Sequence, residues 1–331
     1  REALGRAGIE PPVLGPKDAI ALLNANAFSV GIGALALHDA GLVLQAETVA
    51  GALSLEAAGA NLSPIDPRAV ALRPAPGQAD ASRLLLLLLK GSDLLKAKKP
   101  RRVQDPLSFR CLAPVNGAAF EQLARASASI SADLNGAGDS PAVLVDDEEL
   151  MSTVNFDTTA TSLAFEGLGL AMSHVAAIAV FRTAKLMSAG FSGLPRFLTP
   201  RSAGARTGFA TVQKATSALE AEIRHLALPL GAMTAPVADG VEDYAPMTPR
   251  VVEKTHEIVR RLARLAAIEL IVAAQAVDLR GGQKLGRGTA RAFAFVRARV
   301  PKLDEDRPTG PDFERLAAAI LAGELATALA A

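Results

Sequence analysis

Apolar positions recur at helical spacing through most of the chain, in long segments that proline and glycine separate. This pattern predicts helices over residues 16–40, 41–58, 78–90, 112–135, 155–186, 206–227 and 249–279, with a tail helix after Asp312. Residues 61–77 and 91–110 are predicted to be loops, and residues 135–141 a turn, because Pro, Gly, Asn and Asp gather there. Strands and helices do not alternate, so no parallel sheet is expected. We predict an all-α protein, a bundle of long, roughly antiparallel helices.

The predicted helices suggest one helical domain over residues 1–331. Residues 1–110 are expected to flank the functional site, residues 111–280 to form the central bundle, and residues 281–331 to form a helical tail. Helices of this length usually pack side by side. Their surplus of apolar residues predicts that other subunits bury some of their faces.

Composition excludes several classes of protein. Half of the 331 residues are hydrophobic and the net charge is +1, which excludes a disordered chain. With no basic excess, no Trp and one Tyr, a nucleic-acid partner is not expected. Cys111 is the single cysteine, and the four histidines lack the spacing of zinc ligands, so no metal is expected. The first residues lack a signal-peptide pattern, and residues 167–181 are interpreted as a core helix rather than a membrane span, so we expect a cytoplasmic protein.

Two generic motifs have plain structural explanations. Residues 31–36 match a loosened dinucleotide fingerprint, but they lie inside a predicted helix, where small residues allow close packing; no nucleotide is expected. The basic residues within 96–102 are interpreted as an exposed, solvated loop.

The loop that follows the basic residues contains side chains that could bind a substrate. Residues 104–110 read Gln-Asp-Pro-Leu-Ser-Phe-Arg. Arg110 can bind a carboxylate through two parallel hydrogen bonds, Gln104 can donate and accept, and Asp105 could orient either. The structural alternative is a helix-capping loop with an arginine salt bridge, and these residues alone favour that alternative.

Residues 104–110 resemble the Q-D-x-Y-S-x-R signature of the histidine and aromatic amino-acid ammonia-lyases. Seven further segments resemble blocks of the same family and follow in the family's order: residues 22–24, 52–56, 73–78, 135–141, 155–156, 192–195 and 241–247. One such match is weak, but eight in order, spread over roughly residues 1–310, identify the chain as similar to this family.

The resemblance implies an enzyme that removes ammonia from an L-amino acid and leaves a trans-2-enoate. It also implies a built-in electrophile, methylidene-imidazolone (MIO), formed from an Ala-Ser-Gly tripeptide, with no metal or nucleotide. By match to the family motifs, Arg110 binds the substrate carboxylate with help from Asn24. Gln104 supports the electrophile or the substrate, Phe156 forms a wall of the pocket, and Glu242 handles the amino group or a proton. In the family, each site combines residues from three subunits of a homotetramer.

The chain also departs from the family pattern. It contains no Ala-Ser-Gly, so we expect the MIO segment and a loop tyrosine in an N-terminal part that is truncated, cleaved or carried by another chain. Leu107 occupies the substrate-binding position of the signature tyrosine, and Asp157 and Tyr244 stand where the family has histidines. These changes predict a different substrate or weak activity. They leave open which amino acid is used, and whether the enzyme is a lyase or an aminomutase.

Two other interpretations remain beside the enzyme. The first is a non-catalytic, lyase-like helical scaffold that acts as an oligomerising subunit. The second is a lyase of the fumarase and argininosuccinate-lyase type, whose G-S-S-x-M-P-x-K-x-N signature the chain lacks. For the enzyme, the expected partners are the amino-acid substrate, identical subunits and, where the N-terminal part is a separate chain, an N-terminal fragment of the same protein.

Overall fold

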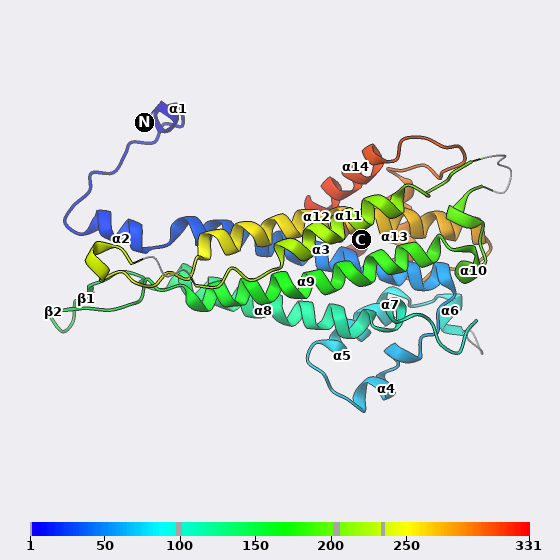
Figure 1. The fold of residues 1–331 in the computed structure, drawn as a ribbon, viewed down its shortest axis with the longest axis horizontal. Coiled ribbons are helices and arrows are strands. Elements are labelled where there is room, and N and C mark those ends of the chain that lie inside the picture. Colours follow the sequence, from blue (N-terminus) through cyan, green and yellow to red (C-terminus); the bar gives the residue numbers. More distant parts are fainter. Residues whose placement is uncertain (1, 97–100, 201–205, 233–235) are drawn as a thin grey trace.

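The computed structural model describes residues 2–96, 101–200, 206–232 and 236–331, and it consists of long helices that run side by side (Figure 1). The four longest are α3 (Ala27–Ala58), α8 (Leu112–Asn135), α9 (Thr159–Leu186) and α12 (Thr248–Arg280). Helix α12 packs along α3 and α9, and α8 packs along α9 and α3. The predicted all-α bundle is confirmed.

Small residues let these helices approach closely. A Cβ atom on Gly33 would lie 2.8 Å from the side chain of Ile130 in α8 and 3.1 Å from that of Phe165 in α9. On Gly51, it would lie 2.7 Å from the side chain of Leu112. Residues 31–36 are part of α3, as the helical pattern predicted, and Gly33 serves helix packing, whereas a Cβ atom on Gly31 would meet no atom within 4 Å.

Two predicted boundaries are wrong. Helix α3 continues through Gly41, where a Cβ atom would meet no atom closer than 3.9 Å, so this glycine does not mark a helix end. The break comes earlier, after α2 (Asp18–Asn24), because Asn26 takes a left-handed conformation with φ of 51°. The predicted loops also contain short helices: α6 (Asp93–Lys96) and α7 (Leu107–Arg110) lie within residues 91–110, and η1 (Ser63–Ile65) and α4 (Pro67–Ala71) within residues 61–77.

Shorter elements surround the bundle (Figure 1). The other α-helices are α1 (Glu2–Arg6), α4 (Pro67–Ala71), α5 (Gln78–Leu88), α10 (Ala189–Ser192), α11 (Val212–Leu226), α13 (Arg287–Arg297), α14 (Gly310–Leu321) and α15 (Glu324–Ala330). The 3-10 helices are η1 (Ser63–Ile65), η2 (Arg196–Leu198) and η3 (Ala238–Gly240). Strands β1 (Ala142–Leu144) and β2 (Glu149–Met151) form an antiparallel hairpin in which Ala142 pairs with Met151.

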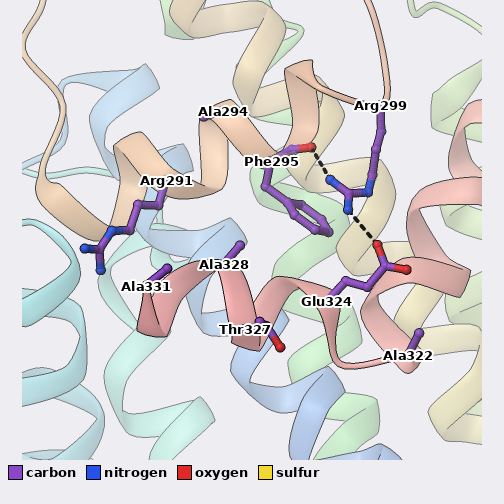
Figure 2. A pocket seen from close by; sticks show the side chains of 9 residues that line it. All are labelled: Arg291, Ala294, Phe295, Arg299, Ala322, Glu324, Thr327, Ala328 and Ala331. Carbon is purple, nitrogen blue, oxygen red and sulfur yellow. Dashed lines mark hydrogen bonds and ion pairs between the residues drawn. The ribbon is translucent and has the colours of Figure 1, made fainter.

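The C-terminal tail folds back onto the bundle through α14, which packs on α12 and α3. A shallow hollow lies between α13 and α15 (Figure 2). At its edge, Arg299 stacks on Phe295 at 3.8 Å and donates to Glu324 at 2.6 Å. This ion pair joins the two tail helices, and none of the sequence-predicted site residues lies in the hollow.

Two helical stretches of the described chain are long and apolar enough to cross a membrane by length and composition: Asp18–Ala58 and Thr159–Leu186. The protein buries only 28% of the most apolar part of the first and 39% of that of the second. Both stretches nevertheless contribute helices to the bundle, since α3 and α9 pack against α8 and α12. A single chain therefore leaves much apolar helix surface uncovered.

Candidate functional site

The sequence-predicted site residues fall into two groups at opposite ends of the bundle (Figure 1). Asn24, Phe156 and Glu242 belong to the α2 end, and Gln104, Leu107 and Arg110 to the α7 end. Helix α9 connects the ends: Thr159 contacts Tyr244 at the first, and Arg182 contacts Ser108 at the second. The helix between Thr159 and Arg182 is about 35 Å long at a rise of 1.5 Å per residue. One chain therefore does not bring the two groups together.

At the α2 end, Asn24 is joined to the turn over residues 135–141. The Nδ2 atom of Asn24 donates to Oδ1 of Asp139 at 3.0 Å. Lys17 forms an ion pair with the other carboxylate oxygen of Asp139 at 2.6 Å and also donates to the carbonyl of Pro141 at 2.8 Å. Hydrogen bonds from Lys17 and then Asn24 lower the pKa of Asp139, so this carboxylate stays ionised and orients Asn24.

Asn26 links Asn24 to Phe156. Its Nδ2 atom donates to the carbonyl of Phe156 at 2.8 Å and to that of Asn24 at 3.0 Å. Asn26 also lines two neighbouring hollows: one of about 800 Å³ with Asn24 and Asn155, and one of about 480 Å³ with Phe156 and Tyr244. Sequence analysis did not single out Asn26. The signal was its residue type, because asparagine tolerates the left-handed conformation that interrupts the helix predicted over residues 16–40.

Glu242 lies on the exposed loop that precedes α12. Its carbonyl accepts from the amide of Val237 at 2.9 Å, which closes a small turn. Two residues later, Tyr244 shares a 2.8 Å hydrogen bond with Thr159 and lines the hollow beside Phe156. Glu242 is therefore close in sequence to a lining residue of this hollow, but it does not line the hollow itself.

A partly buried ion pair holds the start of the same loop. Glu166 of α9 pairs with Lys254 of α12 and accepts from the amide of Leu230 at 2.8 Å. Lys254 in turn donates to the carbonyl of Leu228 at 2.6 Å. Two helices of the bundle thus anchor residues 228–230.

At the α7 end, the side chain of Arg110 is fixed at one nitrogen. Its Nε atom donates to the carbonyl of Asp105 at 2.8 Å, and the carboxylate of Asp105 accepts from the amide of Asn61 at 2.6 Å. Within the part of the chain that the structure describes, no carboxylate forms an ion pair with Arg110. Gln104 is exposed and Leu107 is 62% exposed, so both are accessible from outside the chain. Asp105 orients Arg110 as the sequence suggested, although it does so through its main chain.

Two of the basic residues beside this loop, Arg101 and Arg102, are more constrained than a solvated loop, while Lys98 and Lys99 lie outside the described residues. Arg101 donates to the carbonyl of Ser192 at 2.6 Å. Arg102 donates to the carbonyl of Phe191 and stacks over its ring at 4.1 Å. The ring of Phe191 in turn lies 5.1 Å from that of Phe109 in α7. These contacts join the block over residues 192–195 to residues 104–110, a relationship that sequence analysis missed.

Comparisons with known proteins agree with this architecture. The family model described as aromatic amino acid lyase matches residues 1–298. The histidine ammonia-lyase of Symbiobacterium thermophilum is 36% identical over 330 residues, which cover 100% of this chain and 65% of that protein. The chain thus spans slightly less than two thirds of that relative.

Solved structures share the fold. The ergothioneine-degrading enzyme ergothionase of Treponema denticola superposes with a TM-score of 0.91 at 31% identity, covering 98% of this chain and 65% of that one. The tyrosine aminomutase of Streptomyces globisporus superposes with a TM-score of 0.91 at 27% identity, covering 99% of this chain and 66% of that one. The family match over residues 1–298, together with the ordered motifs at the two bundle ends, shows that this chain belongs to the aromatic amino acid lyase family.

Proposed function

We propose that this chain is part of an ammonia-lyase, a carbon–nitrogen lyase that eliminates ammonia from an L-amino acid to give a trans-2-enoate. Its membership of the aromatic amino acid lyase family supports this assignment, as does its 36% sequence identity to a histidine ammonia-lyase. The same comparisons do not favour a non-catalytic scaffold. The proposed location is the cytoplasm, which agrees with the single cysteine.

The family's electrophile is MIO, which captures the substrate amine. The residues of this chain do not fit its formation, because no Ala-Ser-Gly tripeptide occurs among the 331 residues. We therefore propose that a segment outside these residues supplies it, either as an N-terminal part of the same protein or as a separate fragment. The roles proposed below concern this chain's own side chains.

Arg110 carries the proposal. Its Nε atom is held by the carbonyl of Asp105, and no carboxylate in the described part of the chain pairs with the guanidinium. A guanidinium fixed in this way is prepared to bind an incoming carboxylate, because less side-chain freedom is lost on binding. Gln104, on the same exposed loop, is placed to hydrogen-bond the electrophile or the substrate. Leu107 offers an apolar contact where the family has a tyrosine hydroxyl.

The α2 end supplies the remaining roles. Asn24, oriented by Asp139, assists in binding the substrate carboxylate. Phe156 forms a wall of the pocket at a hollow that Tyr244 also lines. Glu242 accepts a proton or stabilises the substrate ammonium, since a carboxylate next to an ammonium favours its charged form.

Because Arg110 and Asn24 lie at opposite ends of α9, we propose that one site combines the ends of different chains in a homotetramer. The surface of α9 supports this assembly. A seam on α9 repeats at alternating steps of three and four residues. It is exposed at Ala160, Leu163, Leu170, His174 and Phe181 and half-buried at Gly167 and Ala177. This is the spacing with which one helix packs along another. Leu163 is 67% exposed and Phe181 is 62% exposed in a single chain, so another subunit would bury substantial apolar area there.

The decisive experiment replaces Arg110 in the complete enzyme. Arg110→Ala is expected to lower kcat/KM by about a hundredfold, the scale for losing a charged, orienting contact. Arg110→Lys keeps the positive charge but cannot form two parallel hydrogen bonds to a carboxylate, so its kcat/KM should lie between those of the wild type and Arg110→Ala. Arg83→Ala, at an exposed arginine of α5, is the matched control and should leave kcat/KM unchanged. Unchanged kinetics in Arg110→Ala would remove the assignment of Arg110 to the carboxylate.

A second measurement addresses the electrophile and the scaffold alternative together. Treating the complete protein with borohydride should trap an electrophile and abolish ammonia release. A complete protein that neither reacts with borohydride nor releases ammonia from any L-amino acid would be a helical scaffold.

A further inference from the structure

A charged cluster lies in the dry centre of the bundle, behind the α7 end. Arg182 of α9 and Glu269 of α12 are both fully buried. The Nε atom of Arg182 donates to Oε1 of Glu269 at 2.7 Å, and Nη2 donates to Oε2 at 2.8 Å. Ser54 of α3 donates to the same Oε1 atom at 2.7 Å. Three of the longest helices thus meet in one hydrogen-bonded group.

The third nitrogen of Arg182 reaches out of this group to α7. Its Nη1 atom donates to the carbonyl of Ser108 at 3.3 Å. Ser108 lies two residues before Arg110, in a helix of only four residues. A single helical turn has little stability of its own and depends on tertiary contacts. The guanidinium of Arg182 therefore ties the main chain beside Arg110 to the core of the bundle.

The charges of the cluster also fit a rigid support. Glu47 of α3 lies 3.7 Å from Arg182, and burial, followed by the charge of Glu269, raises its pKa well above the usual value. The raised pKa favours the uncharged form of Glu47, and that form leaves one cation, Arg182, beside one anion, Glu269. A buried ion pair is rarely more stable than apolar side chains of equal volume. Net stability is thus a weak reason for this cluster, whereas its hydrogen bonds fix directions that apolar side chains leave free.

We propose that Arg182, supported by Glu269 and Ser54, is a positioning residue that holds α7 so that Arg110 faces the substrate carboxylate. The inference rests on the proposed function of Arg110. It also gives Ser54 a role. This residue lies in the block over residues 52–56, which has no part in the proposed chemistry.

The test uses the complete enzyme with the double variant Arg182→Met/Glu269→Leu, which replaces the pair by apolar side chains of similar volume. We expect KM to rise about tenfold, with a smaller change in kcat, because substrate orientation is lost while the bundle stays packed. Amide hydrogen exchange over residues 107–111 should accelerate. Arg297→Met/Asp278→Leu removes a partly buried pair that does not contact α7, so KM and exchange at α7 should stay as in the wild type.

A folded double variant with unchanged KM and unchanged exchange over residues 107–111 would overturn the proposal. If the double variant does not fold, Ser54→Ala replaces it, since this change removes only one hydroxyl group. It should accelerate exchange at α7 and raise KM by a smaller factor, and the absence of both effects would overturn the proposal. Hydrogen exchange reports on α7 whatever Arg110 binds. Unchanged kinetics in Arg110→Ala therefore contradict the proposed function alone.

Discussion

The side-chain amide of Asn26 donates to the carbonyl of Phe156 at 2.8 Å, joining residues that are 130 positions apart in sequence. The same Nδ2 atom donates to the carbonyl of Asn24 at 3.0 Å. One amide thus sets the distance between the end of α2 and the loop before α9, and with it the relative placement of Asn24 and Phe156.

Asn26→Asp tests this link. Aspartate tolerates the same left-handed backbone but cannot donate from its side chain, so both carbonyls lose their partner. We expect a loss of about 1–2 kcal/mol of unfolding free energy and faster hydrogen exchange over residues 18–24 and 155–158. The control is Asn135→Asp, where the amide serves only one local carbonyl, that of Ser131. It should leave exchange at those segments unchanged, and an equal effect in both variants would contradict the link.

Glu47 predicts a pH-dependent stability. Its pKa is raised in the folded protein, whereas the unfolded chain loses this proton near pH 4.5. The unfolding free energy therefore falls as pH rises from about 4.5 toward the folded pKa. Glu47→Gln keeps the shape without a titrating proton, so its Tm should exceed that of the wild type at pH 8, and the difference should shrink at pH 5. Thermal unfolding at both values measures this.

Glu149→Gln, at an exposed residue of β2, is the control and should show no such pH-dependent difference. A difference between Glu47→Gln and the wild type that is equal at pH 5 and pH 8 would show that Glu47 is ionised in the folded protein.

Two main chains approach closely at Gly117. A Cβ atom there would lie 2.5 Å from the carbonyl carbon of Gly77, whose φ of +70° itself favours glycine. Gly117→Ala should therefore destabilise the protein by about 2–3 kcal/mol, although alanine is the better helix former. Gly41→Ala has space and should instead gain up to about 1 kcal/mol. Denaturant unfolding of both variants compares them, and the same sign for both would contradict the steric argument.

Assembly can be tested at the α9 seam. Leu170→Arg places a charge in the middle of the apolar stripe, so we expect smaller assemblies by light scattering and loss of activity in the complete enzyme, with helical content retained. Leu72→Arg introduces the same charge at an exposed leucine outside the seam and should leave the assembly intact. An intact, active tetramer carrying Leu170→Arg would show that the seam is not a subunit interface.

Sequence reasoning predicted the helices well where apolar periodicity was long and uninterrupted. It failed at Gly41 because a glycine inside a helix is costly on average, and only the surrounding space shows that it is tolerated there. The true break at Asn26 depends on one backbone angle and on a hydrogen bond to the distant carbonyl of Phe156, which no local pattern contains. Helix α7 was missed because one turn is too short to show a period.

The residues of the candidate site could be predicted from the sequence, but their arrangement in space could not. The ordered motifs identified Arg110 and Asn24, yet nothing in their spacing indicates that α9 separates them. The buried pair of Arg182 and Glu269 was also beyond sequence reasoning, since each is one of several charged residues in its helix and nothing in the sequence marks the two as partners. The apolar surplus of the long helices did anticipate the uncovered seam on α9.

The length of α9 also has a genetic consequence. If every site draws its halves from separate chains, then two inactive variants, Arg110→Ala and Glu242→Ala, damage different halves. Co-expressed in one cell, they should assemble some sites that contain neither lesion and so restore activity that neither variant has alone. Conversely, one defective chain would impair sites that its neighbours share, so a mutation at either end would be partly dominant. The activity of a site then depends on the composition of the assembly and not on one chain alone.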